Sequence, residues 1–435
     1  MSEKPLDAFA TGSTEIHTEI TEGPSVYAVN PRAFPDRMRA SVRELLLDLI
    51  RFPSTRGQEG PAIRYLYEKM APLVDRCQLV EIGDDLMQDP DYAFPLPGHS
   101  NRDTPNLECV IRGSGEGRSV VFNTHLDVVP PSDDQVDPFV PREENGIIFG
   151  RGACDAKGQA ATLYTLALLL REQGIRPGGD VTFHFVVEEE NGGNGTLTMV
   201  RRGVKADAAV VLEPTEMAVV PAVRGAVWFE LQLFGRAGHS GSQGGRISAL
   251  DKAIQAKEIL RRYHDRLLAA ARGLPHFDRF QDPMPLTFGQ CVAGNWPASV
   301  PARATLKGVL GFLPNHRREQ VQEGMRQALL AEGDEWLREH FELSFPMLRS
   351  DGNMIPPDHP LVMSLLAAVR RQGFPERVTA MTGSCDAWFY NNRAGIPTVV
   401  FGPGSLQYAH SKEEQVSLEE ILAAAAVLAE FVAGL

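Results

Sequence analysis

The first half of the chain alternates short apolar runs with segments whose apolar residues recur at helical spacing. The apolar runs of strand length are residues 107–111, 120–124, 181–187 and 208–212. The helix-like segments are residues 37–50, 59–73 and 158–170. Strands that are apolar on both faces are typical of a mostly parallel sheet covered by helices on both sides. The pattern therefore predicts an α/β, doubly wound fold, in which a site forms beyond the carboxyl ends of the strands.

The pattern changes after residue 222, and this change predicts a second domain. Residues 227–233 alternate between apolar and polar, as in an antiparallel strand with one solvated face. They are followed by a helix from residue 247 to about residue 271, strand-like runs at 286–290 and 303–312, a helix at 317–330 and a run at 341–345. This β-α-β-β-α-β order is the ferredoxin-like pattern. We expect an inserted α+β domain at residues 223–349, a first domain formed by residues 1–222 and 350–435, and an aperiodic lead-in at residues 1–36.

Length, composition and charge restrict the class of protein. A chain of 435 residues with 43% hydrophobic and 23% charged residues is typical of a soluble globular protein of two or three domains. A formal net charge of −13 argues against nucleic acid and against an anionic membrane surface as partners. Residues 1–30 lack the apolar core of a signal peptide and no window could span a bilayer, so we expect a cytoplasmic protein. The five cysteines never show CxxC spacing, which rules out a thiolate zinc knuckle and a disulfide framework.

Acidic residues recur at the ends of successive apolar runs, and two histidines accompany them. His125 and Asp127 follow directly on the run 120–124, and a neighbouring carboxylate can fix the tautomer of a metal-binding imidazole. The other members of the set are Asp155, Glu189, Glu190, Glu213 and His410. Each has an alternative interpretation on its own, as a capped strand end, a helix N-cap or part of a solvated loop. Their joint occurrence at strand ends does not follow from capping, and it predicts a metal centre.

The composition of this set restricts the metal. Two imidazoles and several carboxylates, without sulfur, suit zinc, with cobalt or manganese as substitutes. The set holds more ligands than a single catalytic zinc uses, which favours two divalent ions bridged by one carboxylate. A carboxylate left over from the ligand set can then act as general base on a water molecule.

An ordered set of motifs resembles those of the co-catalytic zinc amidohydrolases, the family that contains acetylornithine deacetylase, succinyl-diaminopimelate desuccinylase, aminoacylase and glutamate carboxypeptidase. The matching segments are THLDVVP at 124–130, GRGACDAKG at 150–158, EENGG at 189–193, LEPT at 212–215, GRAGHSG at 235–241, GIPTVVFGPG at 395–404 and YAHSKEEQV at 408–416. A lone HxD pair is a weak signal, whereas this series in the family's order is specific. The resemblance implies a zinc-hydrolase catalytic domain with an inserted dimerisation and lid domain.

The resemblance also divides the ligands between two zinc ions. His125 and Glu213 would bind one ion, Glu190 and His410 the other, and Asp155 would bridge them. In relatives the peptide bond that corresponds to Asp155–Ala156 is cis, and the same is expected here.

Further roles follow from the same resemblance. Glu189 would be the general base, which leaves Glu188 outside the acidic pair, and Asp127 would orient His125. His239 resembles the lid-domain histidine that reaches the active site of the partner subunit, which implies a homodimer. An imidazole there can hydrogen-bond a developing oxyanion; the alternative for His239 is a histidine in a glycine-rich turn.

Two departures from the family pattern bear on the substrate. Many relatives carry an asparagine and, further on, an arginine that binds the substrate carboxylate, whereas Ala298 and Gly311 stand at these positions here. Either Arg303 or Arg393 has taken over this task, or the substrate lacks the carboxylate.

The tryptophans near these positions indicate what the substrate offers instead. Trp296 and Trp388 would suit an apolar or aromatic group, unless both belong to the core. We therefore expect a preference for substrates with an apolar or aromatic part over acetyl-amino acids with charged side chains.

The sequence thus predicts a zinc-dependent amidohydrolase, a deacylase that hydrolyses the amide bond of a small N-acylated substrate with Glu189 as base. Two alternatives stay open. One is a dipeptidase or carboxypeptidase that uses the same centre, and the other is an inactive, metal-stabilised binding protein. The presence of Glu189 and of every ligand argues against the second alternative.

Overall fold

The protein is represented by a computed structural model that describes residues 34–93, 101, 103–241 and 244–435. The predicted lead-in, residues 1–36, lies almost wholly outside this part of the chain. Among the helices described, none has the length and apolar content that a membrane span requires.

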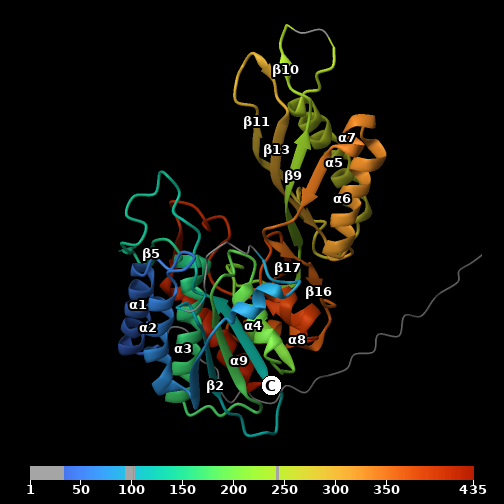
Figure 1. The fold of residues 1–435 in the computed structure, drawn as a ribbon. Coiled ribbons are helices and arrows are strands. Elements are labelled where there is room, and N and C mark those ends of the chain that lie inside the picture. Colours follow the sequence, from blue (N-terminus) through green and yellow to red (C-terminus); the bar gives the residue numbers. More distant parts are fainter. Residues whose placement is uncertain (1–33, 94–100, 102, 242–243) are drawn as a thin grey trace, which may run out of the picture.

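A mixed nine-stranded sheet, the larger sheet, forms the centre of the larger part of the molecule (Figure 1). Its strands are β1 (Arg76–Val80), β2 (Asn106–Ile111), β3 (Val120–His125), β6 (Val181–Val186), β7 (Ala208–Val211), β8 (Val219–Val223), β16 (Asn353–Met354), β17 (Val378–Met381) and β18 (Thr398–Val400). Their order is β1-β2-β6-β3-β7-β18-β8-β16, with β17 paired to β8. The central strands β6, β3, β7 and β18 are parallel, and both edges contain antiparallel pairs. The parallel centre confirms the α/β prediction.

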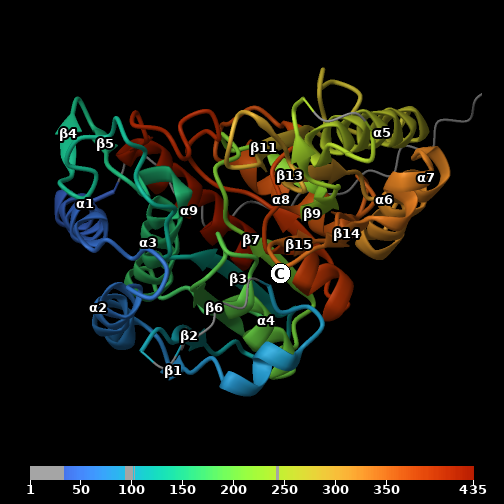
Figure 2. The same ribbon diagram turned by 45° about the horizontal axis from the view of Figure 1, so that its top comes forward.

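Helices cover both faces of this sheet, because the side chains of a strand point alternately to opposite faces. Val120 and Phe122 of β3 belong to one core cluster, whereas Val121 packs with Leu197 and Trp388 on the other face. The first face is covered by α1 (Asp36–Arg51), α2 (Gly60–Met70), α3 (Gly158–Glu172), α8 (Pro360–Arg371) and α9 (Leu418–Ala433). The second face is covered by α4 (Asn194–Arg201) and η5 (Phe389–Arg393). Figure 2 shows α3 and α4 on opposite sides of β6.

Short elements connect these layers. The turns η2 (Ala71–Leu73) and η3 (Asp84–Gln88) follow α2 and β1. A three-stranded sheet joins β4 (Arg142–Glu144), β5 (Ile147–Phe149) and β19 (Gln415–Ser417). This sheet holds the segment that enters η4 (Ala153–Lys157) beside the segment that enters α9.

A five-stranded antiparallel sheet, the smaller sheet, forms the second part of the molecule, above the first in Figure 1. It contains β9 (Gly225–Phe234), β11 (Leu286–Ala293), β13 (Arg303–Phe312), β14 (Phe341–Ser344) and β15 (Arg349–Ser350). The helices α5 (Ala249–Ala270), α6 (Arg318–Glu332) and α7 (Glu335–Glu339) accompany it. Along β9 buried and half-buried residues alternate, as the sequence predicted. The order β9-α5-β11-β13-α6-β14 confirms the predicted pattern.

The chain passes between the two sheets twice. β8 pairs within the larger sheet and β9 within the smaller one, while β15 pairs with β9 and β16 with β8. A two-stranded ribbon of β10 (Gly238–His239) and β12 (Ser299–Val300) lies at the far end of the second part (Figure 1). The assignment of residues 223–349 as one inserted domain stays a prediction.

Candidate metal centre

Three parallel strands bring predicted ligands to the same edge of the larger sheet. β3 ends at His125, while Glu190 follows β6 and Glu213 follows β7. Because β3 pairs in parallel with both β6 and β7, the segments beyond these strands leave the sheet side by side. The ligands therefore gather where the strand pattern places a site.

Asp155 lies between the two imidazoles. Its Oδ1 is 3.0 Å from Nε2 of His125, and its Oδ2 is 3.2 Å from Nε2 of His410. Oε1 of Glu190 is 3.0 Å from the same nitrogen of His410, and Oε1 of Glu213 is 3.9 Å from Nε2 of His125. The ligand atoms of His125, Asp155 and Glu190 all lie within 4.8 Å of one another, so these residues could hold a metal ion.

Asp127 supports the site in two ways. Its backbone oxygen lies 3.0 Å from Nδ1 of His125; since a carbonyl only accepts, Nδ1 donates and Nε2 faces Asp155. Its carboxylate lies 3.5 Å from Nδ1 of His125 and accepts the backbone N–H groups of Glu189 and Glu190 at 3.2 and 3.0 Å. Asp127 therefore lies closest to His125 through its main chain, while its carboxylate binds the backbone of the acidic loop.

The three consecutive glutamates after β6 have different surroundings. Glu189 and Glu190 line a cavity of about 510 Å³ at the cluster, together with Asp155, Glu213 and His410. Glu188 is buried elsewhere, where Arg56 Nε donates to its Oε1 at 3.1 Å and Asn194 Nδ2 to its Oε2 at 2.6 Å. Of these three glutamates, Glu189 alone lines the cavity and forms neither a hydrogen bond nor an ion pair with His125 or His410 in the part of the chain that the structure describes.

Sequence reasoning missed Glu414, which fixes the segment that carries Asp155. Its Oε1 accepts the backbone N–H groups of Cys154 and Asp155 at 3.3 and 3.2 Å, and Arg151 Nη1 donates to its Oε2 at 2.5 Å. Within this segment the Asp155–Ala156 peptide is cis, which confirms the expectation. The only signal in the sequence was the position of Glu414 inside the motif that contains His410.

His239 does not line this cavity. It is exposed in the β10–β12 ribbon, opposite Ser299, and its Nδ1 accepts the backbone N–H of Gly241 at 3.0 Å. The β10 strand, which ends at His239, lies at the far end of the second part of the molecule, away from the larger sheet (Figure 1).

The tryptophans expected in the cavity are elsewhere as well. Trp296 is 66% exposed, and Trp388 is buried in the core. The cavity wall formed by the smaller sheet instead contains Trp228 of β9 and Val309 of β13, which are cross-strand neighbours.

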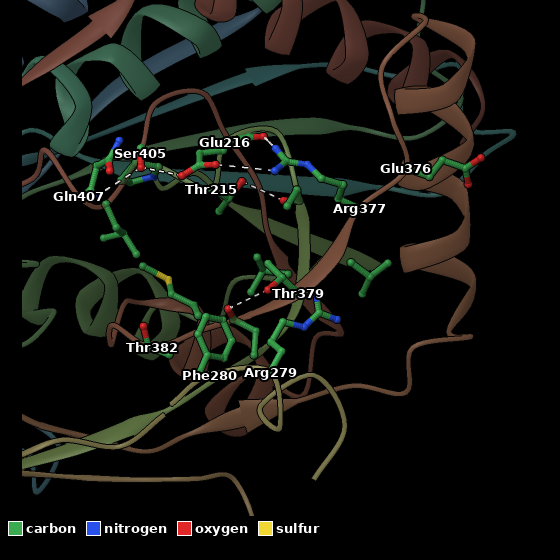
Figure 3. Close-up of a pocket in the computed structure, with 17 residues that line it drawn as sticks. Thr215, Glu216, Arg279, Phe280, Glu376, Arg377, Thr379, Thr382, Ser405 and Gln407 are labelled. Atoms are coloured by element: carbon green, nitrogen blue, oxygen red, sulfur yellow. Dashed lines mark hydrogen bonds and ion pairs between the residues drawn. The ribbon is translucent and has the colours of Figure 1, made fainter. Parts of the chain in front are cut away.

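A second cavity, of about 620 Å³, adjoins the first, since Met381 and Leu406 line both. Its polar groups are largely engaged with one another (Figure 3): Ser405 donates to Glu216 at 2.6 Å, and Arg377 is 3.7 Å from the same carboxylate. It contains none of the predicted ligands, which line the smaller cavity instead.

The profile of Peptidase family M20/M25/M40 matches residues 121–434. The chain belongs to this family. Among curated proteins, it is 29% identical over 361 residues to the N-formyl-4-amino-5-aminomethyl-2-methylpyrimidine deformylase of Bacillus subtilis (strain 168), covering 75% of this chain and 82% of that protein. It is also 29% identical over 339 residues to the acetylornithine deacetylase of Myxococcus xanthus, covering 75% of this chain and 83% of that protein.

A solved member of the family shares the fold. The YXEP protein of Bacillus subtilis, described as a dinuclear metal-binding peptidase, superposes with a TM-score of 0.63 at 17% identity. The superposition covers 92% of this chain and 98% of that protein. The two-part architecture found here is therefore that of the peptidase family.

In the present chain, buried carboxylates set the charge of the imidazoles of His125 and His410. Burial acts to lower the pKa of His410, but hydrogen bonds to Asp155 and Glu190 outweigh burial and raise that pKa to about 10. Burial likewise opposes a charge on His125, yet hydrogen bonds to Asp127 and Asp155 hold its pKa well above its usual range. The carboxylates of the cluster therefore favour a positive charge at each of the two imidazoles.

For the remaining carboxylates burial is the largest effect, and it outweighs the attraction of the nearby imidazoles. Burial raises the pKa of Glu189, Glu190 and Glu213, with repulsion between neighbouring carboxylates adding to the effect. Imidazole nitrogens and carboxylate oxygens without thiolate are the donors that zinc and other first-row divalent ions use. In donor chemistry and in charge, the residues fit a divalent metal ion.

Replacing Glu414 with Gln should destabilise the fold, because it leaves the buried guanidinium of Arg151 without its counter-charge. Removing one partner of a buried ion pair typically costs about 3 kcal/mol, which urea titrations of the free energy of unfolding would measure. The exposed neighbour Glu413 is the matched control, and Glu413→Gln should change the free energy by less than about 0.5 kcal/mol. Equal losses in the two variants would contradict this assignment.

Proposed function

We propose that the protein is a metal-dependent amidohydrolase that cleaves the amide bond of a small N-acylated substrate. One observation carries the proposal: Asp155 lies between His125 and His410, and Glu189 lines the same cavity without contacting either imidazole. A cluster of metal ligands with a carboxylate left over is what the attack of water on an amide carbonyl requires.

Two divalent ions would be held here, zinc being best suited and cobalt or manganese being alternatives. His125 and Glu213 would bind one ion, Glu190 and His410 the other, with Asp155 shared between them. Bound there, the ions would polarise the substrate carbonyl and make a water molecule acidic enough to lose a proton near neutral pH.

Glu189 would move the proton. Its carboxylate would accept a proton from the attacking water and pass it to the nitrogen of the leaving amine as the C–N bond breaks. Burial raises the pKa of Glu189 well above its usual range, which strengthens it as a proton acceptor. Asp127 would keep Glu189 in position by accepting its backbone N–H at 3.2 Å.

An N-acylated substrate is favoured over a peptide. Both curated relatives named above remove an acyl group, according to their names, while the solved relative is described as a peptidase. A dipeptidase or carboxypeptidase with the same centre is therefore the second candidate.

We assign residues 223–349 as a dimerisation and lid domain, and residues 1–222 with 350–435 as the catalytic domain. β11 is an edge strand of the smaller sheet, and Val292 on it is 68% exposed. A second copy of the chain could extend the sheet at this edge. Since His239 lies at the far end of this domain, its use in catalysis requires a metal centre supplied by the partner subunit.

Glu189→Gln should keep about two metal ions per chain while lowering kcat by several orders of magnitude, since it removes the proton acceptor and no ligand. Metal analysis and hydrolysis of a panel of N-formyl, N-acetyl and N-benzoyl amides and dipeptides would measure both effects. Dipeptides as the best substrates would favour the peptidase candidate. A metal-loaded wild-type protein inactive on the whole panel would point to the binding-protein alternative.

Glu188→Gln is the control for the choice of base. Because Arg56 and Asn194 hold Glu188 away from the cavity, the folded variant should retain turnover. An active Glu189→Gln together with a folded but inactive Glu188→Gln would place the base one residue earlier.

Mixing His239→Ala chains with Glu189→Gln chains should restore activity if His239 acts across a dimer. One of the two sites in each heterodimer would then contain both intact groups, so up to about half of the wild-type activity per heterodimer is expected. Activity assays on heterodimers purified with two different tags would measure it. Without any recovery, His239 would act in its own subunit or outside the chemistry.

A further inference from the structure

The cavity at the metal centre has a positive side. Among the described residues that line it, Arg224 is the only arginine, and it shares the lining with Glu189, Glu190 and His410. Arg224 stands directly ahead of β9, between β8 of the larger sheet and β9 of the smaller one.

The guanidinium of Arg224 has hydrogen bonds but no counter-ion. Its Nε donates to the backbone oxygen of Thr382, and its Nη1 donates to that of Gly225 at 3.2 Å. Within the part of the chain that the structure describes, no carboxylate forms an ion pair with it, and Asp282 acts only by a longer-range attraction. Burial lowers the pKa of Arg224 to about 10, so the group is still charged at neutral pH. A charge removed from water without a counter-ion is costly, and an anionic ligand would offset that cost.

Gly311 leaves the space that Arg224 occupies. In the antiparallel pairing of β13 with β9, Gly311 lies opposite Ala226. A Cβ at position 311 would lie 3.2 Å from Nη1 of Arg224, tighter than most contacts of real side chains. A long side chain at 311 would therefore compete with the guanidinium for one place in the cavity wall.

The other two arginines expected to replace the missing one are engaged elsewhere. Arg303 lies over the ring of Phe234, with its Cζ 5.8 Å from the ring centre. Arg393 donates from Nε to Asp91 at 2.7 Å. Neither lines the cavity.

We propose that Arg224 is a specificity residue that binds a carboxylate of the substrate, and that the same substrate carries an apolar group against Trp228, Val309 and Leu348. The inference rests on the proposed amidohydrolase function. A guanidinium presents paired N–H donors that match the two oxygens of a carboxylate, and Nη2 makes no hydrogen bond to any residue that the structure describes. The arginine that relatives carry at the position of Gly311 is therefore replaced by Arg224. The sequence alone had left open whether the substrate lacks a carboxylate.

The test measures binding, so that it does not depend on turnover. Isothermal titration calorimetry on metal-loaded Glu189→Gln protein would compare N-benzoylglycine with N-benzoylglycinamide, which differ only at the carboxylate. We expect the carboxylate to bind roughly 10- to 100-fold more tightly, as for a charge-assisted hydrogen-bonded pair. Adding Arg224→Met should bring this ratio to within about threefold of unity, whereas Arg303→Met, the matched control, should leave it unchanged.

Several outcomes would overturn the proposal. A preference that survives Arg224→Met would mean that the metals or another group hold the carboxylate, and equal affinities or no binding in the parent protein would also contradict it. Thermal unfolding checks each variant, and if Arg224→Met fails to fold, Arg224→Lys, which keeps the charge without the paired donors, should lose most of the ratio. Failure of the amidohydrolase proposal would appear separately, as a lack of turnover in protein with Glu189 intact.

A cysteine pair at the edge of the larger sheet carries a second, independent inference. Cys77 on β1 lies directly opposite Cys109 on β2 in antiparallel register, and the two Sγ atoms are 2.8 Å apart. Cys109 is buried, whereas Cys77 is half-buried and so within reach of a small oxidant. The hydrogen bond from Cys109 lowers the pKa of the Cys77 thiol, which makes Cys77 the better nucleophile of the pair.

We infer that Cys77 and Cys109 form a reversible disulfide with a small-molecule disulfide as oxidant. The Cys77 thiolate attacks that disulfide, releases one thiol and leaves a mixed disulfide on Cys77. The Cys109 thiolate then attacks the Cys77 sulfur and releases the second thiol. The product joins the edge strand to its neighbour, and by restricting the unfolded chain it should raise the unfolding temperature.

Treatment of the whole protein with oxidised glutathione tests this inference. Mass spectrometry should show the loss of two hydrogens and a Cys77–Cys109 cross-linked peptide, and the unfolding temperature should rise by several degrees. Cys77→Ser and Cys109→Ser should each abolish both effects, while Cys291→Ser, at an exposed cysteine, should not. Stable glutathione adducts without cross-linking, or five unreacted thiols, would overturn the inference.

Discussion

Buried negative charge beyond the ends of β3, β6 and β7 is the constraint on which the rest of the structure depends. Carboxylates removed from water repel one another strongly, and they persist as anions only beside cations or hydrogen-bond donors. Asp155 satisfies this requirement by giving one oxygen to each imidazole, at 3.0 and 3.2 Å. The same carboxylates raise the pKa values of His125 and His410, so the cluster favours bound positive charge, which protons or divalent cations can supply.

The surrounding chain supplies donors to hold these ligands in place. Asp127 accepts backbone N–H groups from the loop after β6, and Glu414 accepts them from the segment that contains Asp155. Two of the segments that carry predicted ligands are thus tied to other elements, which restricts the distances between these side chains as a metal site requires. Arg151 forms a buried ion pair with the second carboxylate oxygen of Glu414. Glu414 therefore adds little net charge to the core.

The parts of this arrangement that local sequence determines were predictable. Strand-length apolar runs ending in polar residues predicted that Glu190 and Glu213 lie near His125, as the structure has them, because parallel strands bring their carboxyl ends to one edge of a sheet. The β-α-β-β-α-β order was also readable, because alternation along β9 differs from the continuous apolar runs of the parallel strands. The individual role assigned to each site residue stays a prediction, since it depends on metals and substrate.

Features that depend on the pairing of distant segments were not predictable. Cys77 and Cys109 are 32 residues apart and meet only through the register of β1 with β2. Glu414 contacts Cys154 across 260 positions of sequence. Comparison of motifs could show that glycine stands at position 311, where relatives carry an arginine. Only the register of β13 with β9 could show that Arg224 lies beside it.

The two ends of the cavity are therefore constrained in different ways. At the end with the predicted metal site, His125, Glu190 and Glu213 follow the ends of β3, β6 and β7, while Asp155 lies in η4 and His410 in the segment after β18. At the other end, β9 and β13 run side by side, so that positions on either strand reach the same space. A charged side chain at this end can come from β13 or from the residue ahead of β9 without displacing the predicted metal ligands. Such freedom is a physical reason why relatives of this chain can be named for substrates as different as an acylated amino acid and a formylated pyrimidine.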